Sequence, residues 1–307
     1  MSRIYEALQR ADLERKAAQE AEAKQFAEPG VIPGIEEPPL AKAEVALEGI
    51  PQHPWKPFLS SFPTLADRGA DVEQFRSLRS RLYQARYEAP LKTILISSGM
   101  PSEGKTFVAA NLAITLARNS VNHILLIDGD LRRPTLHSLL GAPNAPGLSE
   151  YLAGTAALNA IMQRDSSSKT VEAASVVSVS NLTFIPSGKC GDNSSELVAN
   201  HRIEELIAAV SPHFDWIIID TPPVLAVTDA VDLARAADAV LLIARGASTP
   251  YDVAQRTQAT FSNSRILGFV LNDVKEAQRS GSYYYYYYGG PEASGNAKRR
   301  KDGETQE

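Results

Sequence analysis

The stretch TILISSGMPSEGKTF, residues 93–107, decides the fold of this chain. Its first five residues read as a buried strand, and a helical pattern follows from 106 to 119. Between them, GMPSEGKT (Gly99–Thr106) fits the pattern G-x-x-x-x-G-K-[ST] in its proper setting, after a strand and at the start of a helix. The stretch therefore predicts a phosphate-binding loop.

The chemistry of such a loop comes from its backbone. Glycines let successive N–H groups face the phosphates, and the N-terminus of the helix adds its positive end. In this arrangement Lys105 reaches the β- and γ-phosphates of ATP, and the Thr106 hydroxyl ligates Mg²⁺. We therefore expect ATP and Mg²⁺ as cofactors. The predicted nucleotide-binding residues are Gly99, Met100, Pro101, Ser102, Glu103, Gly104, Lys105, Thr106 and Phe107.

Apolar runs typical of parallel strands recur along the chain, and each is followed by a helical or turn segment. The predicted strands are 93–97, 123–128, 181–186, 215–220, 239–245 and 266–274. The predicted helices in this region are 71–87, 106–119, 194–210, 229–237 and 249–262. Strands that alternate with helices predict an α/β fold with a doubly wound, mostly parallel sheet. Together with the loop, this indicates a P-loop NTPase.

Composition divides the chain into four parts. Residues 1–28 read as an N-terminal amphipathic helix, and eight prolines between 29 and 63 indicate an extended linker over 29–69. The P-loop domain is expected at 70–274. Residues 275–307 are rich in Gly, Ser, Lys and Glu, and we expect a flexible tail. This tail contains six consecutive tyrosines, Tyr283, Tyr284, Tyr285, Tyr286, Tyr287 and Tyr288, which no core could bury on alternate faces.

The overall charge and the cysteine content exclude some classes. A formal net charge of −5 over 307 residues gives no argument for a nucleic-acid partner. Cys190 is the single cysteine, which excludes an intramolecular disulfide and fits a reducing compartment. No run approaches 18 apolar residues, and the N-terminus is not of signal-peptide type. We expect a cytoplasmic protein.

Carboxylates follow two of the predicted strands. LLIDGDLRRP places Asp128 and Asp130 just after one strand, and WIIIDTPP places Asp220 at the end of another. Since the carboxyl ends of parallel strands line the ligand crevice, these three side chains are expected near the phosphates. The common alternative for each aspartate alone is a helix cap or a turn.

These motifs resemble those of the bacterial tyrosine kinases, or BY-kinases, of capsule and exopolysaccharide assembly. SSGMPSEGKT, ILLIDGDLRRP and WIIIDTPP are similar to that family's Walker A, Walker A′ and Walker B motifs. PGLSEYLAG and PSGKCGDNSSELV resemble its intervening segments, and the family also ends in a tyrosine cluster. The resemblance covers about residues 70–290. The opening MSRIYEALQRA resembles a subgroup of stand-alone kinases.

The resemblance implies roles for single residues. Lys105, Asp128, Asp130 and Asp220 would be catalytic, with Asp220, Thr106 and Asp128 at the metal. Asp128 is the candidate base for an incoming tyrosine, because free tyrosine with a pKa near 10 is a poor nucleophile at neutral pH. Asp130 would assist the metal or the base. Arg132 and Arg133 would steady charge or form surface ion pairs, and Asn272 resembles the adenine-contacting asparagine of related ATPases.

The resemblance also implies partners. VEQFRSLRSRL matches the E-x-x-R-x-x-R helix of the family through Glu73, Arg76 and Arg79, which would form a contact between subunits. Neighbouring subunits would form a ring in which the tail of one chain enters the next active site. Phosphorylation of the six tyrosines in trans would then regulate polysaccharide synthesis and export. A separate transmembrane activator would recruit the protein to the inner membrane face, and a phosphotyrosine phosphatase would reverse the modification.

Two other functions use the same motifs. A partitioning or division-site ATPase would use the loop and the carboxylates to switch between monomer and dimer. Such ATPases generally have an additional lysine early in the loop, whereas Met100 to Glu103 contain none. A nucleotide-binding scaffold without significant catalysis is the third reading.

Overall fold

A computed structural model of the chain describes residues 49–274, with gaps at 67, 120, 167–180 and 190–193. The predicted N-terminal helix and the whole predicted tail, with all six tyrosines of the cluster, lie outside the described residues. The strands are β1 (Gln52–His53), β2 (Thr93–Ser98), β3 (Ile124–Asp128), β4 (Gln163–Asp165), β5 (Leu182–Ile185), β6 (Trp216–Asp220), β7 (Ala239–Arg245) and β8 (Ile266–Asn272).

The α-helices are α2 (Ala70–Glu88), α3 (Lys105–Ala117), α4 (Leu136–Leu140), α5 (Leu148–Leu152), α6 (Leu158–Ile161), α7 (Ser194–Ala199), α8 (Arg202–Val210), α9 (Asp229–Ala234) and α10 (Tyr251–Thr260). Short 3-10 turns occur at η2 (Leu59–Ser61), η3 (Pro63–Leu65) and η5 (Ser211–His213). Among the described residues, no helix is long and apolar enough to cross a bilayer.

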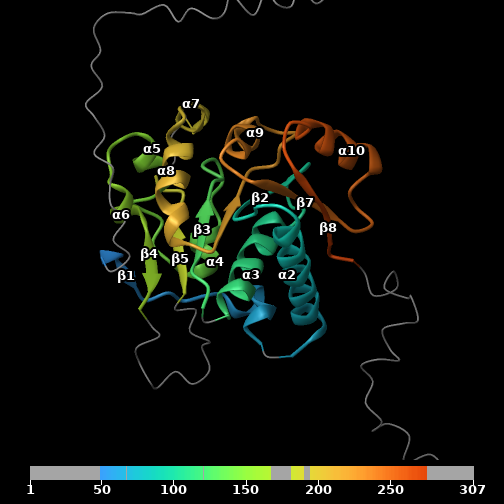
Figure 1. Cartoon of the computed structure of the whole chain (residues 1–307), viewed down its shortest axis with the longest axis horizontal. Helices are drawn as coiled ribbons and strands as arrows, with labels where there is room; N and C mark the ends of the chain where they lie inside the picture. Colours follow the sequence, from blue (N-terminus) through green and yellow to red (C-terminus); the bar gives the residue numbers. More distant parts are fainter. Residues whose placement is uncertain (1–48, 67, 120, 167–180, 190–193, 275–307) are drawn as a thin grey trace, which may run out of the picture. The chain divides into compact units, whose positions relative to one another are not determined.

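The strands form one sheet in the order β1-β4-β5-β3-β6-β2-β7-β8. All neighbouring strands are parallel except β4 and β5, which are antiparallel. Helices cover both faces of the sheet, and Figure 1 shows α2 and α3 side by side on one of them. The predicted α/β fold with a mostly parallel, doubly wound sheet is therefore confirmed.

Side chains of the central strands point alternately to the two faces of the sheet, and each face has its own hydrophobic core. On β2, Ile94 and Ile96 pack with α2, α3 and α4, while Leu95 packs into the layer of α5 to α9. All three side chains are fully buried. Successive side chains of a strand point to opposite faces, so a strand covered on both sides is apolar throughout. This explains why the strands appear in the sequence as continuous apolar runs.

The predicted boundary at residue 70 is wrong, because the second half of the predicted linker belongs to the folded domain. Ile50, Trp55 and Phe62 are at most 6% exposed, and β1 joins the edge of the sheet. The buried Asn111 of α3 holds this segment by accepting a hydrogen bond from Thr64 Oγ1 at 2.7 Å. Proline density suggested an extended linker, but proline is compatible with the 3-10 turns that this segment forms.

The helix predicted over 194–210 is divided in the structure. α7 ends at Ala199 and α8 starts at Arg202. The helical periodicity of the sequence continues through this break, which is why a single helix was expected. The strands β1 and β4 were not predicted, because runs of two and three residues are too short for a periodic signal.

Candidate active site

The phosphate-binding loop lies between β2 and α3, as the motif predicts. Ser102 has φ +63° and Gly104 has φ +90°, so two residues of the loop are left-handed. Left-handed residues turn neighbouring N–H groups toward a common anion, and α3 begins at Lys105 with its N-terminus behind the loop. A Cβ at Gly99 would collide with Val253 and Thr257 of α10, so this position requires glycine.

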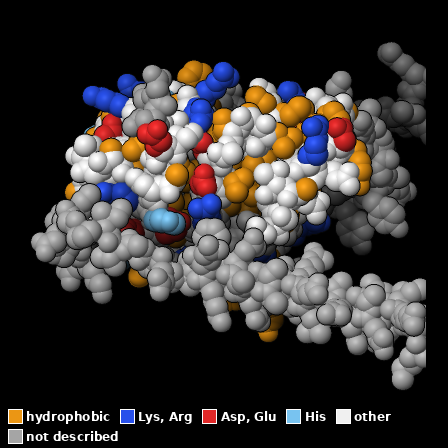
Figure 2. Space-filling view, turned by 90° about the horizontal axis from the view of Figure 1, so that it is seen from above, with side chains coloured by type: hydrophobic (Ala, Val, Ile, Leu, Met, Phe, Trp, Pro, Cys, Tyr) orange, Lys and Arg blue, Asp and Glu red, His pale blue; other side chains and the backbone are white. Residues whose placement is uncertain are grey.

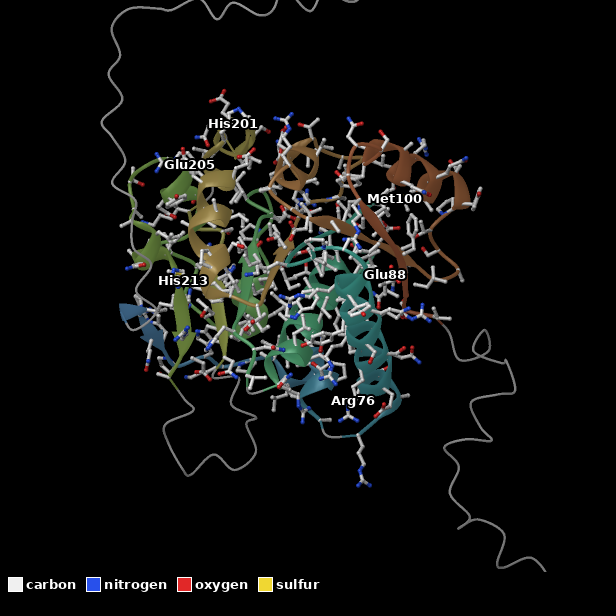
Figure 3. All side chains as sticks on the ribbon, in the orientation of Figure 1. Arg76, Glu88, Met100, His201, Glu205 and His213 are labelled. Atoms are coloured by element: carbon white, nitrogen blue, oxygen red, sulfur yellow. The ribbon has the colours of Figure 1, made fainter. Side chains whose placement is uncertain are left out.

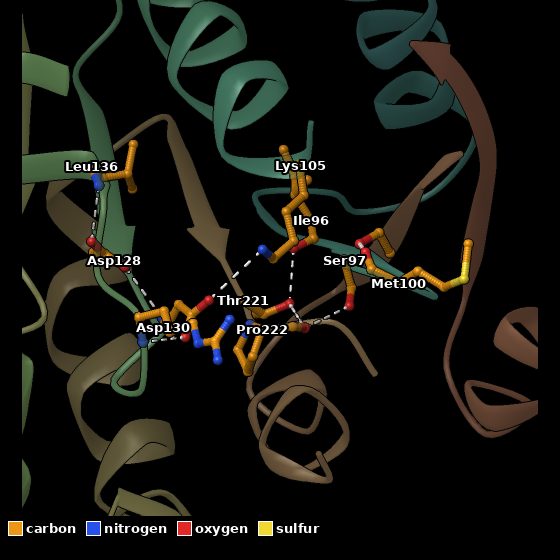
Figure 4. A network of polar contacts seen from close by, with 11 residues as sticks. Ile96, Ser97, Met100, Lys105, Asp128, Asp130, Leu136, Thr221 and Pro222 are labelled. Carbon is orange, nitrogen blue, oxygen red and sulfur yellow. Dashed lines mark hydrogen bonds and ion pairs between the residues drawn. The ribbon is translucent and has the colours of Figure 1, made fainter. Parts of the chain in front are cut away.

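The sheet places the three aspartates at one edge. β3 and β6 are neighbours, and their last residues, Asp128 and Asp220, are paired in register. Asp130 follows two residues later, and its Oδ2 lies 3.7 Å from Lys105 Nζ. Figure 4 shows the Lys105 side chain extending from α3 toward Asp130. The structure thus brings Lys105 and the three acids together, and it also places Thr106 beside Asp220.

Asp220 is the aspartate whose carboxylate has no hydrogen-bond partner among the described residues. It is 1% exposed, and no described residue makes a hydrogen bond to either of its carboxylate oxygens. Burial raises the pKa of Asp220 to about 6, although the nearby Lys105 ammonium and Thr106 hydroxyl oppose the rise. Two buried, unpartnered oxygens beside a hydroxyl suit a hard cation such as Mg²⁺. The residues present therefore fit the predicted metal.

Asp128 has a different environment. It is fully buried, and its two oxygens accept hydrogen bonds from the backbone N–H groups of Asp130 and Leu136, each at 3.2 Å. Burial raises the pKa of Asp128 well above its ordinary value, and repulsion from Asp220 and Asp130 adds to the rise. Asp128 is therefore a stronger base than a solvated aspartate, whereas Asp130, at 6% exposure, lies nearer the surface.

Asn272 and Phe107 lie on the other side of the loop. The Asn272 side chain donates to the Glu103 carbonyl at 3.0 Å and would collide with a Cβ at Gly104. Both residues line a cavity of about 960 Å³ between α2, the loop and β8. Asn272 thus touches the loop backbone directly, and its predicted contact with adenine stays a prediction.

The two arginines after the Walker A′ aspartates differ in their contacts. Arg132 is bound to the buried Asp229 at the start of α9, with Nε 2.8 Å from Asp229 Oδ2, and it also contacts Ser195 of α7. Arg133 donates its backbone N–H to Asp130 at 3.0 Å. The ion pair with Asp229 and the hydrogen bond to Ser195 together join the loop after β3 to α9 and α7. The motif did not reveal this, because Asp229 and Ser195 are 97 and 63 residues away.

The predicted subunit-contact residues lie on α2, where Arg76 is labelled in Figure 3. Arg76 and Glu73 form an ion pair at 2.5 Å within the helix, and both side chains are about 40% exposed. Arg79 donates to the Thr115 carbonyl of α3 at 3.2 Å, which joins the two helices. The predicted contact between subunits stays a prediction for all three residues.

The loops at the carboxyl ends of the strands lie on the side of the molecule that Figure 2 views from above. On this side, apolar side chains lie between charged ones. Leu225 and Tyr251, which follow β6 and β7, are 39% and 82% exposed. Since the acids and the phosphate loop open at this edge, it is the face that a substrate would approach.

The fold and the site together define a P-loop nucleotide-binding domain. A family model described as AAA domain matches residues 91–251, which includes the loop and all three aspartates.

Relatives of known name define the family more closely. The tyrosine-protein kinase YwqD of Bacillus subtilis is 32% identical over 215 residues, which are 69% of this chain and 85% of that protein. The tyrosine-protein kinase etk of Escherichia coli K12 is 38% identical over 231 residues, or 73% of this chain. The tyrosine-protein kinase wzc of Salmonella typhimurium is 36% identical over 66% of this chain. The chain belongs to the family of bacterial tyrosine kinases.

Solved structures agree. The kinase domain of E. coli tyrosine kinase ETK matches with a TM-score of 0.60 and 34% identity, covering 66% of this chain and 75% of that one. The chimerical protein CapA2B2 matches with a TM-score of 0.62 and 27% identity, covering 74% and 96%. The chain spans only 27% of the Salmonella wzc protein and 30% of E. coli etk.

Proposed function

We propose that this protein is an ATP-dependent protein-tyrosine autokinase that phosphorylates Tyr283–Tyr288 in trans and thereby regulates exopolysaccharide or capsule synthesis. The observation that carries the proposal is the convergence of Lys105, Asp130 and Asp220 at the mouth of a phosphate-binding loop. A chain of the bacterial tyrosine kinase family with six consecutive tyrosines has both the site and the acceptor.

In the proposed reaction, the phenol oxygen of a tyrosine attacks the γ-phosphorus of ATP. A new P–O bond forms, the bond to the oxygen between the β- and γ-phosphates breaks, and ADP leaves. The phenol proton passes to the pair of Asp128 and Asp130, in which burial raises the pKa of Asp128 and Asp130 is the more exposed member. Lys105 neutralises charge on the phosphates, and to do so its ammonium must exchange Asp130 for the nucleotide.

Mg²⁺ would be held by Asp220 and Thr106. It would supply positive charge to the phosphates of ATP, as divalent ions do in phosphoryl transfer. Asp128 was also predicted at the metal, but both of its oxygens already accept backbone hydrogen bonds. We therefore assign the metal to Asp220 in preference to Asp128.

The assembly is part of the same proposal. Delivery of the tail to the active site of a neighbouring subunit in a ring is the arrangement that the resemblance to the family implies. Glu73, Arg76 and Arg79 on α2 would form the contact. A separate transmembrane activator at the inner membrane face and a phosphotyrosine phosphatase would complete the regulatory cycle.

A mixing experiment tests the kinase and the trans reaction together. Lys105→Met and a variant lacking 283–288 are each incubated with Mg-ATP and the activator fragment, alone and mixed, and phosphotyrosine is measured by mass spectrometry. Neither variant alone should label its tail, because one lacks the catalytic lysine and the other lacks the acceptors. In the mixture, label should appear on the Lys105→Met chain.

Lys56→Met is the matched control, because Lys56 is exposed. Its hydrogen bond to the Gly141 carbonyl is donated by the backbone N–H, which the substitution keeps. It should label like the wild type. Equal labelling of the wild type and the unmixed Lys105→Met would refute the proposed kinase. Label that appears in the wild type but not in the mixture would refute transfer in trans.

A further inference from the structure

Glu103 places a carboxylate that is 2% exposed inside a phosphate-binding loop, a site made for anions. One oxygen accepts the backbone N–H of Met100 at 2.8 Å. The other accepts the hydroxyl of Thr249, in the turn between β7 and α10. Both acceptor atoms are thus engaged, which is the condition under which a buried carboxylate is tolerated.

The hydroxyl of Thr249 is placed by a further bond. Its oxygen accepts the backbone N–H of Arg245 at 2.8 Å, so its single hydrogen is free to point at Glu103. Arg245 in turn binds Asp273 at 2.5 Å. A chain of bonds therefore connects the phosphate loop to the end of β7 and to the residue that follows β8.

The backbone of Glu103 is held as well. Its carbonyl accepts the side chain of Asn272 at 3.0 Å. Glu103 stands between Ser102 and Gly104, the two left-handed residues of the loop. A non-glycine residue such as Ser102 is strained in that conformation and keeps it only where its surroundings impose it. The contacts of Glu103 hold the residue that stands directly next to Ser102 in the loop.

We propose that Glu103 is a positioning residue, and that its hydrogen bond with Thr249 holds the phosphate loop in the shape that binds Mg-nucleotide. The carboxylate occupies the Met100 N–H, which leaves the later N–H groups of the loop to face phosphate. The inference rests on the proposed function only in that the loop binds a nucleotide, and it adds two residues outside the Walker motifs, Thr249 and Arg245, to the machinery of the loop.

Thr249→Val tests this bond, and Thr249→Ser is its matched control. Valine has nearly the shape of threonine but lacks the hydroxyl, so Glu103 loses a donor while the packing is kept. Serine keeps the hydroxyl. The affinity for Mg-ADP is measured by calorimetry, and KM for ATP and kcat are measured in the phosphorylation assay.

Loss of one hydrogen bond to a buried charge should raise both the Kd for Mg-ADP and the KM for ATP by about tenfold in Thr249→Val. The value of kcat should change by less than about threefold, because the loop binds ground state and transition state alike. In Thr249→Ser, which retains the hydroxyl, the Kd for Mg-ADP and the KM for ATP should stay within about twofold of the wild-type values. In Glu103→Gln an amide NH2 replaces one carboxylate oxygen, so one of the two donors to Glu103 loses its acceptor. This variant should also weaken Mg-ADP binding.

A Thr249→Val protein with a lower melting temperature but an unchanged Kd for Mg-ADP would show that the bond only stabilises the fold, and the inference would be overturned. The Kd measurement does not depend on kinase activity. If the wild type transfers no phosphate while Thr249→Val still weakens Mg-ADP binding, the proposed function fails and this inference stands.

Discussion

Replacing Asp220 by asparagine should make the ligand-free protein more stable at neutral pH. Asp220 is buried with no hydrogen-bond partner among the described residues, and its pKa is raised from 3.8 to about 6. A carboxyl with a raised pKa binds its proton more tightly in the folded state than in the unfolded chain. Ionisation of Asp220 therefore costs folding free energy, and the cost is absent below about pH 4 and complete above about pH 6.

The magnitude follows from the two pKa values. Their difference corresponds to about 3 kcal/mol of unfolding free energy at pH 7.5. Asparagine keeps the shape without the charge, so Asp220→Asn should gain an amount of this order at pH 7.5 but only about 1 kcal/mol at pH 4.5. Lys105 loses one neighbouring carboxylate in the variant but keeps Asp130 at 3.7 Å. Removal of the Asp220 charge also relieves its repulsion of Asp128.

The assay is urea unfolding in EDTA at both pH values, followed by the fluorescence of the buried Trp55 and Trp216. When the measurement is repeated with Mg-ADP, the unfolding free energy of the wild type should rise. For Asp220→Asn, Mg-ADP should raise the unfolding free energy no more than ADP in EDTA does. Asp229→Asn is the control with the opposite sign. Asp229 is equally buried but paired with Arg132 at 2.8 Å, so its neutralisation should lower stability.

Two outcomes would refute this reasoning. One is an Asp220→Asn protein no more stable than the wild type at pH 7.5. The other is a gain in stability that is equally large at pH 4.5, which would mean that the charge of Asp220 is not its source.

Two further predictions concern the supports of the site. In Arg132→Lys, the ammonium cannot bridge Asp229 and Ser195 as the guanidinium does. This substitution should therefore lower the unfolding free energy by about 1 kcal/mol and reduce phosphorylation. Arg133→Lys should change neither quantity. Urea unfolding and the labelling assay check both, and equal effects of the two substitutions would contradict the assignment. Removal of residues 1–48 should leave a cooperative thermal transition, whereas removal of 1–69 should abolish it, because loss of a buried large aromatic such as Trp55 or Phe62 costs about 3–5 kcal/mol. Circular dichroism distinguishes the two, and a stable 70–307 chain would restore the boundary predicted from composition.

Local patterns predicted most of the fold. The predicted strand 239–245 has the bounds of β7, and 93–97 and 215–220 differ from β2 and β6 by one residue at one end. These strands are apolar on both faces and lie at the centre of the sheet, so burial dominates their composition. Short strands at the edge carry no such signal. The segment 49–66 was missed for the same reason, since a few buried side chains among prolines do not form a period.

The sequence alone determined the phosphate loop, the start of α3 and the position of each aspartate at the end of a strand. Those are local facts, because the loop motif, the strand and the helix are contiguous in the chain and their geometry follows from residue types a few positions apart. The tertiary structure alone decided that β3 and β6 are neighbours and that Thr249 reaches Glu103 across 146 positions. It also decided that Asp220 has no hydrogen-bond partner in the described part of the chain, while Asp128 is bonded. Contacts of this kind depend on which strands pair and how helices pack over them, and no spacing within one segment encodes that choice.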